Sequence, residues 1–143
     1  MIAYADTSAL IPLIIDEPGS QRAGRVWDTA EQVASVRLVY AEARAALAQA
    51  ARLGRITASG LSGSVAALDG LYEQLALIEV DDVLVRRAGE LAELHALRGY
   101  DAVHLAAAER IADDTTVVVS GDRELLAAAG TLGLAVADTS VLG

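Results

Sequence analysis

Short runs of β-type residues alternate along this chain with longer stretches of helical periodicity. The short runs predict five strands, at residues 2–5, 32–35, 77–80, 116–119 and 135–137. The longer stretches predict helices at residues 9–15, 20–30, 37–53, 57–75, 81–98, 101–112 and 123–129. Because strands that alternate with helices need crossover connections, we expect an α/β fold with a small, mostly parallel sheet and helices on both of its faces.

Polar residues and glycines mark several of the expected helix ends. Ser35 precedes the helix at 37–53 as a candidate cap, and Gly54 follows it as a stop signal. The stretch at 57–75 is a weaker helix, since its three internal glycines lower helix propensity.

The size and hydropathy of the chain fit one domain over residues 1–143. Hydrophobic residues make up 54% of the 143 residues, and the mean hydropathy of +0.40 is enough to fill one core. The chain has no cysteine, which excludes disulfide scaffolds, thiolate nucleophiles and cysteine zinc sites. It starts without a basic segment, and no apolar run reaches about 18 residues, so we expect a cytoplasmic protein with no membrane span.

The charge balance is acidic and contains no lysine. The formal net charge is −9, from 20 acidic residues against 11 basic residues, all of which are arginine. This balance argues against a protein that coats nucleic acid by bulk charge, although it leaves room for a local nucleic-acid site. Without lysine the chain can form no Schiff base and has no P-loop lysine. Arginine must therefore bind any phosphate.

Four carboxylates stand at positions that suggest a common site. Asp6 and Asp122 each follow an expected parallel strand, at the sheet edge where ligands bind in open α/β folds. Glu42 and Asp101 lie within apolar helical sequence, where an ionised carboxylate is costly without a positive charge beside it. Carboxylate oxygens suit Mg²⁺ or Mn²⁺, so the four residues are candidate ligands of a divalent metal.

Simpler interpretations of the same residues remain open. Each of the three aspartates also fits the role of a helix cap, and Glu42 fits that of a solvated side chain or an ion-pair partner of arginine. His104, three residues after Asp101, is more typical of a packed core histidine than of a site residue. His95 is expected in the core or at an interface, and Trp27 and Tyr40 are expected in the core or partly buried. Four acidic residues are expected on the solvated surface (Glu90, Glu93, Asp113, Asp114).

Four segments together resemble a PIN-domain ribonuclease, and more narrowly a VapC-type toxin of a type II toxin–antitoxin pair. They are Asp6-Thr7-Ser8, the segment at 35–42 that ends on Glu42, the segment at 97–106 around Asp101, and the segment at 118–125 around Asp122. Each motif is weak alone, whereas their order and spacing make a strong signal that runs from residue 1 to 137.

The resemblance implies a PIN fold in which Asp6, Glu42, Asp101 and Asp122 form one acidic pocket for Mg²⁺ or Mn²⁺. It also implies that Ser120, Thr7 and Ser8 support this site through their hydroxyls. We expect metal-assisted hydrolysis of RNA, with the three aspartates as ligands and Glu42 as a further ligand or as the group that positions the attacking water. The arginines nearest in sequence, and so the candidates for gripping phosphate, are Arg123, Arg44 and Arg98.

The resemblance further implies a cognate antitoxin and a homodimer. An apolar stripe within 57–75 is either core or a surface for a partner helix, and the second interpretation predicts that Leu68→Asp weakens antitoxin binding in a folded domain. The stripe consists of Leu61, Val65, Leu68, Leu71 and Leu75.

Two other functions are weighed against the nuclease. One is a non-catalytic PIN-like interaction domain, and the other is an aspartate-based phosphoryl-transfer protein. The lack of lysine and of an Asp-x-Asp motif at the first strand disfavours phosphoryl transfer.

Overall fold

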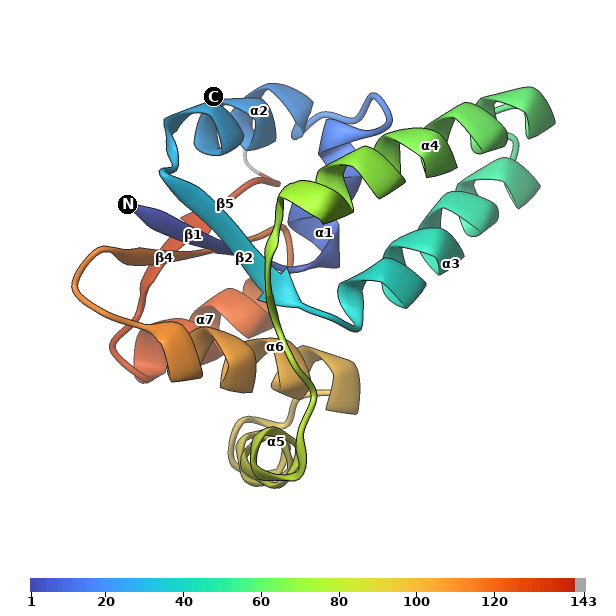
Figure 1. The fold of residues 1–143 in the computed structure, drawn as a ribbon. Coiled ribbons are helices and arrows are strands. Elements are labelled where there is room, and N and C mark those ends of the chain that lie inside the picture. The colour runs from blue at the N-terminus through green and yellow to red at the C-terminus, as the bar shows by residue number, and fades with distance from the viewer. Residues whose placement is uncertain (141–143) are drawn as a thin grey trace.

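The computed structural model describes residues 1–140, and these residues assemble around one parallel sheet (Figure 1). The strand order is β3-β2-β1-β4-β5, and every neighbouring pair is parallel. The strands are β1 Ile2–Ala5, β2 Gln32–Val36, β3 Ala76–Ile78, β4 Thr116–Ser120 and β5 Ala135–Asp138. All five expected strands are present, and the predicted α/β class is confirmed. The part of the predicted domain at 141–143 lies outside the described residues.

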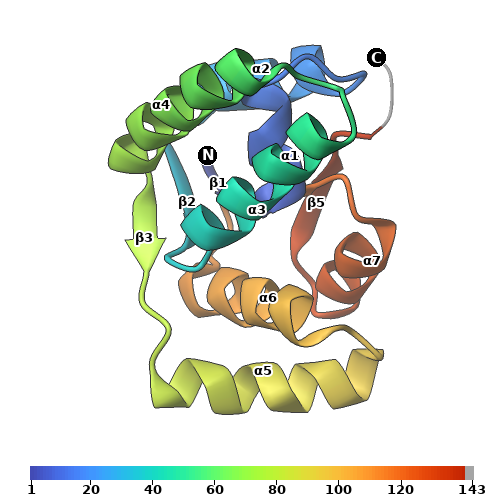
Figure 2. The same cartoon turned by 90° about the vertical axis from the view of Figure 1, so that its right-hand side faces the viewer.

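Helices cover both faces of the sheet, as predicted (Figure 2). The helices are α1 Thr7–Leu10, η1 Ile11–Leu13, α2 Ser20–Thr29, α3 Val39–Arg52, α4 Ala58–Gln74, α5 Asp82–His95, α6 Gly99–Ile111 and α7 Arg123–Thr131. Side chains alternate between the two faces of β1. Tyr4 belongs to the core that includes residues of α5, α6 and α7, whereas Ala3 and Ala5 belong to the core that includes residues of α1.

Several local predictions from the sequence are wrong in their boundaries. The helix predicted at 81–98 ends at His95, because Ala96 takes a left-handed backbone conformation. The strand predicted at 77–80 ends at Ile78, because its partner β2 ends at Val36, the residue paired with Ile78. The helix predicted at 9–15 begins earlier and tightens to a 3₁₀ turn at Pro12, which has no N–H to donate. The helix predicted at 101–112 begins at Gly99.

Ser35 does not cap α3. It lies inside β2, and its Oγ donates to the carbonyl oxygen of Ala5 across 2.7 Å. The helix begins only at Val39, with Leu38 at its N-cap and no side-chain cap. Ser35 therefore ties the end of β1 to β2. Gly54, by contrast, follows the helix with a φ of 76°, as its position predicts.

The α3–α4 hairpin extends away from the sheet (Figure 1) and carries its own small core. Leu68 is only 1% exposed and belongs to a buried cluster that includes Ala43 and Leu47 of α3. The interpretation of Leu68 as a surface residue for a partner helix is therefore wrong. Leu75 is also buried, whereas Leu61, Val65 and Leu71 are partly buried.

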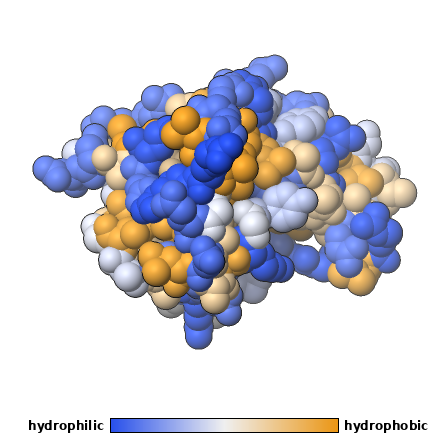
Figure 3. Space-filling model, turned by 90° about the horizontal axis from the view of Figure 1, so that it is seen from below, coloured by the Kyte–Doolittle hydropathy of each residue, from blue (hydrophilic) through white to orange (hydrophobic). Residues whose placement is uncertain are grey.

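The surface mixes charged and apolar side chains. The face seen from below, where α5 lies, shows apolar patches between charged groups (Figure 3). Trp27 and Tyr40 are partly buried and the four acidic residues are exposed, as expected, and His95 is partly buried too. Among residues 1–140 no helix combines the length and the hydropathy needed to cross a bilayer.

Candidate active site

The four predicted carboxylates line one pocket beside the carboxyl ends of β1 and β4. Asp6, Glu42, Asp101 and Asp122 come from four different parts of the chain and enclose a volume of about 380 Å³. The other lining residues are Thr7, Ser8, Ile11, Ile15, Glu17, Ala46, Arg55, Arg98 and His104. The topology explains why Asp6 and Asp122 meet, because the ends of the neighbouring parallel strands β1 and β4 open on the same edge of the sheet.

Asp6 is the most deeply placed of the four carboxylates, at 4% exposure. It caps α1 by accepting from the amide of Ala9, and its two oxygens each accept from a serine hydroxyl. Burial raises the pKa of Asp6 above its usual value, and the nearby His104 and the serine hydroxyls oppose this rise. Three hydrogen bonds therefore hold the Asp6 carboxyl in a fixed position at the pocket.

Two serines fix the carboxylate of Asp6. Ser8 Oγ lies 2.7 Å from Oδ1, and Ser120 Oγ lies 2.7 Å from Oδ2. Each hydroxyl also accepts a backbone amide, Ser8 from Gly121 and Ser120 from Asp122. The loops after β1 and β4 are thus tied together around one carboxylate. Both serines lie where the family resemblance expects supporting hydroxyls.

The capping interpretation holds for two of the three aspartates. Asp122 accepts the amides of Glu124 and Leu125 at the start of α7, all through Oδ1. Asp101 caps nothing, because it is the third residue of α6 and Arg98 stands at the N-cap. Capping and pocket lining coexist at Asp6 and Asp122, so the two interpretations do not exclude each other.

Glu42 and His104 are joined at the inner wall of the pocket. Glu42 lies in the first turn of α3, and its Oε1 is 2.7 Å from Nε2 of His104. The other ring nitrogen of His104 is 2.8 Å from the hydroxyl of Tyr4. Glu42 therefore pairs with histidine rather than with arginine. His104 is buried, as expected, and it also lines the site.

Arginines stand at two places on the pocket wall. Arg98 donates to Oδ2 of Asp101 across 3.2 Å, and this contact raises the pKa of the guanidinium. Arg55 donates to Oε1 of Glu17 across 2.7 Å. Sequence patterns do not single out Arg55 and Glu17, because both lie in connecting loops that only the fold brings together.

Two of the three arginines proposed from sequence proximity do not line the pocket. Arg44 lies over the ring of Tyr40, 5.7 Å from its centroid, and donates to its hydroxyl. Arg123 is exposed at the start of α7. Nearness in sequence to Glu42 and Asp122 is a poor guide here, because neighbouring residues on a helix point in different directions.

The donor set of the pocket suits a hard divalent cation that keeps part of its water shell. Within residues 1–140 no three Asp, Glu or His side chains lie close enough to form a closed cage. Mg²⁺ commonly uses one or two carboxylates and several waters, which an open pocket of this kind provides. Thr7 Oγ1, which belongs to the lining, is buried without a hydrogen-bond partner in the described part of the chain. An unsatisfied oxygen beside carboxylates fits a site that takes up a hydrated ion or a phosphate.

The sequence and the structure both match known proteins. Residues 3–131 match the family model described as PIN domain. Ribonuclease VapC45 and Ribonuclease VapC49 of Mycobacterium tuberculosis are each 40% identical over 136 residues, covering 95% of this chain and 94% of each relative.

Two solved structures share the fold. PAE2754 from Pyrobaculum aerophilum has a TM-score of 0.71 at 26% identity, covering 98% of this chain and 85% of that chain. A member of the VapBC family of toxin–antitoxin systems from Mycobacterium tuberculosis has a TM-score of 0.62 at 19% identity, covering 96% and 98%. At that identity the second match supports the fold alone.

Proposed function

The chain belongs to the PIN-domain family, among its VapC ribonucleases, and from this membership we propose that it is a divalent-metal-dependent endoribonuclease that acts as the toxin of a type II toxin–antitoxin pair. The observation that carries the proposal is the pocket that four carboxylates from separate segments line together. This pocket lies at the carboxyl ends of parallel strands, which is the edge where open α/β sheets bind ligands.

Asp6, Asp101 and Asp122 would hold Mg²⁺ or Mn²⁺, with Glu42 as a further ligand or as the group that orients the attacking water. When bound, such an ion supplies a water of lowered pKa and positive charge for the leaving oxygen. Ser8 and Ser120 keep both oxygens of Asp6 in place through their hydroxyls. Glu42 offers Oε2 to the pocket, since Oε1 is taken by His104.

Arg98 and Arg55 are the groups that we assign to the RNA phosphates. Among residues 1–140, five carboxylates and only these two arginines line the pocket. A polyanion therefore needs both guanidiniums as well as the metal to enter. Each arginine has a carboxylate partner in the free protein, Asp101 for Arg98 and Glu17 for Arg55. A phosphate would take over these donors. Arg44 and Arg123 have no part in this assignment.

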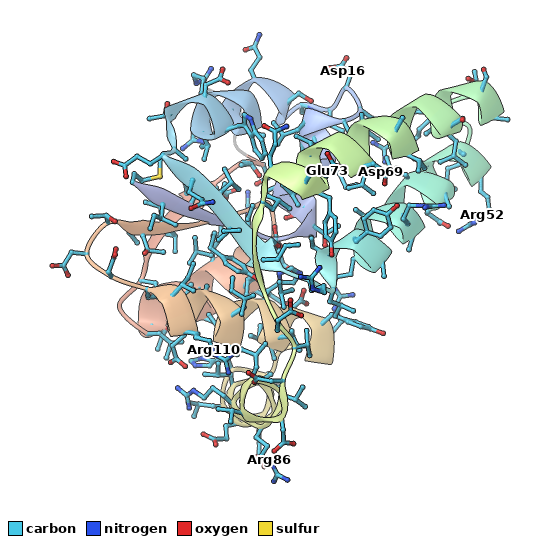
Figure 4. The ribbon with its side chains drawn as sticks, in the orientation of Figure 1. Asp16, Arg52, Asp69, Glu73, Arg86 and Arg110 are labelled. Carbon is cyan, nitrogen blue, oxygen red and sulfur yellow. The ribbon has the colours of Figure 1, made fainter. Side chains whose placement is uncertain are left out.

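The decisive experiment is RNA cleavage with and without the metal. The purified chain is expected to cleave single-stranded RNA with Mg²⁺ or Mn²⁺, to lose cleavage in EDTA, and to regain it when the metal is restored. Asp6→Asn is expected to abolish cleavage, whereas Asp16→Asn, at an exposed aspartate on the outer side of the molecule (Figure 4), is expected to leave it unchanged. Cleavage that persists in EDTA, or in Asp6→Asn, contradicts the proposal.

The same assay separates the nuclease from a non-catalytic PIN-like domain, which would cleave nothing under any of these conditions. Aspartate-based phosphoryl transfer is excluded by the family to which the chain belongs.

An antitoxin and a homodimer complete the proposal. Solved toxin–antitoxin complexes with the same fold support a protein partner. Apolar side chains that stay exposed on α5 and at the start of α6 offer a contact surface, among them Val83, Leu94 and Tyr100. Light scattering on the purified chain is expected to give twice the monomer mass of 14.8 kDa, and the monomer mass alone contradicts the homodimer.

A further inference from the structure

Three side chains from three separate elements form a continuous hydrogen-bonded chain that ends in the pocket. Tyr4 comes from β1, His104 from α6 and Glu42 from α3. Tyr4 and His104 are almost completely buried, whereas the Glu42 side chain is 21% exposed. The chain therefore leads from the core to the edge of the active site.

The carboxylate of Glu42 sets the direction of its hydrogen bond with His104. An ionised carboxylate only accepts, so Nε2 of His104 carries the hydrogen and donates to Oε1 of Glu42 across 2.7 Å. The Tyr4 hydroxyl lies 2.8 Å from Nδ1 of His104 and forms the second hydrogen bond, because a hydroxyl both donates and accepts. Burial raises the pKa of Tyr4 well above its ordinary value, which keeps this hydroxyl protonated.

The ring of His104 is held on two sides. Its nitrogens are both satisfied, and its plane stands at 73° to the ring of Tyr4 with 5.9 Å between centroids. A ring fixed in this way presents its N–H at one point of the pocket wall. A glutamate side chain has three rotatable bonds, so without this donor Glu42 would be free to leave the pocket.

We propose that His104 is a positioning residue for Glu42, and that Tyr4 holds the histidine ring in the orientation for this role. The inference rests on the proposed function, because it gives Glu42 its task at the metal or at the attacking water. His104 binds one oxygen of Glu42 and leaves the other without a hydrogen-bond partner within residues 1–140, open to the pocket. Groups that orient carboxylate ligands in this way are typical of metal sites.

The test compares His104→Phe with His104→Gln. Phenylalanine keeps a flat ring but no donor, whereas the glutamine amide reaches about as far as Nε2 and can donate to Glu42. His104→Phe is expected to lower kcat about 10- to 100-fold and to weaken Mn²⁺ binding measured without RNA by about tenfold, with KM for RNA unchanged. His104→Gln is expected to recover most of both losses, and Tyr4→Phe to show a smaller loss of kcat.

A double-mutant cycle with Glu42→Gln separates positioning from a merely structural role. If His104 acts through Glu42, His104→Phe costs nothing further in the Glu42→Gln background. The inference is overturned if the effects of His104→Phe and Glu42→Gln simply add. It is also overturned if His104→Phe equals the native chain in kcat and Mn²⁺ affinity.

The two proposals fail in different ways. A native chain that binds no Mn²⁺ and cleaves no RNA overturns the proposed function, whereas an active native chain with additive effects overturns only the role of His104. If His104→Phe does not fold, His104→Asn replaces it, because its shorter amide does not reach Glu42. Equal kcat in the asparagine and glutamine variants then overturns the inference.

Discussion

Ser120 donates a hydrogen bond from its Oγ to Oδ2 of Asp6 across 2.7 Å, and so joins the carboxyl end of β4 to that of β1. Ser120 is fully buried, and the same hydroxyl accepts the amide of Asp122. One side chain therefore sets the relative position of two of the proposed metal ligands. A hydroxyl is suited to this task because it donates and accepts at once.

Removal of this hydroxyl is expected to weaken the site without unfolding the protein. Ser120→Ala should lower Mn²⁺ affinity or kcat about 10- to 100-fold, as is usual for groups that orient metal ligands. Isothermal titration with Mn²⁺ and RNA cleavage rates measure the two effects. Ser62→Ala, at an exposed serine of α4, is the matched control and should change neither. A Ser120→Ala enzyme that behaves like the native chain would show that Ser8 alone orients Asp6.

Arg55 is expected to contribute to RNA binding although sequence proximity did not suggest it. It lines the pocket, whereas Arg52, three residues earlier at the end of α3 (Figure 4), is not among the lining residues and contacts Gln49. Arg55→Ala should raise KM for RNA several-fold and lower the salt dependence of binding by about one phosphate contact. Arg52→Ala should do neither. Equal effects of the two substitutions would show that Arg55 acts only through its positive charge and not through a specific contact with RNA.

The alternation of strands and helices could be predicted because hydrophobic periodicity records it directly. The ends of strands and helices could not be predicted where pairing with a distant strand decides them. Val80 continues the apolar pattern beyond β3, yet β2 ends at Val36, which pairs with Ile78. Ser35 has the composition of a cap, but its place in β2 lets it bond Ala5 instead. The local sequence does not tell whether Ser35 caps a helix or lies in a strand, because strand pairing decides this.

The carboxylates of the site could be predicted because each follows a strand or interrupts an apolar helix. Their partners could not. The contact of His104 with Glu42 joins residues 62 positions apart, and the contact of Arg55 with Glu17 joins residues 38 apart. Such pairs depend on how the α3–α4 hairpin lies against the sheet. Sequence spacing therefore identified the charged groups but not the groups that hold them.

Leu68 is expected to stabilise the α3–α4 hairpin and, through it, the wall that carries Glu42. It is 1% exposed and packs in the cluster of Leu47 and Ile11. Leu68→Ala should lower the free energy of unfolding by about 2–5 kcal/mol, from lost burial and the cavity left behind. Urea unfolding followed by circular dichroism measures this change. Ala66→Ser, at an exposed position of the same helix, should stay within about 0.5 kcal/mol of the native chain, and a comparably small loss for Leu68→Ala would show that the hairpin core is not tightly packed.

The ion pair between Asp81 and Arg110 is expected to make stability depend on pH in the acidic range. Arg110 donates to both oxygens of Asp81, beside α5 (Figure 4), and with the Leu84 amide it lowers the pKa of Asp81 from 3.8 to about 2. The folded state therefore binds this proton less readily than the unfolded state, so the contribution of Asp81 is complete above about pH 4 and is lost as the pH falls toward 2. Asp81→Asn keeps a good helix cap but removes the charge. Its urea midpoint should lie below that of the native chain at pH 6, and the two midpoints should converge as the pH is lowered. Asp114→Asn, at an exposed loop position, should have the same urea midpoint as the native chain at every pH. If the midpoint of Asp81→Asn stays equally far below the native midpoint down to about pH 2, the lost stability comes from the helix cap and not from the ion pair.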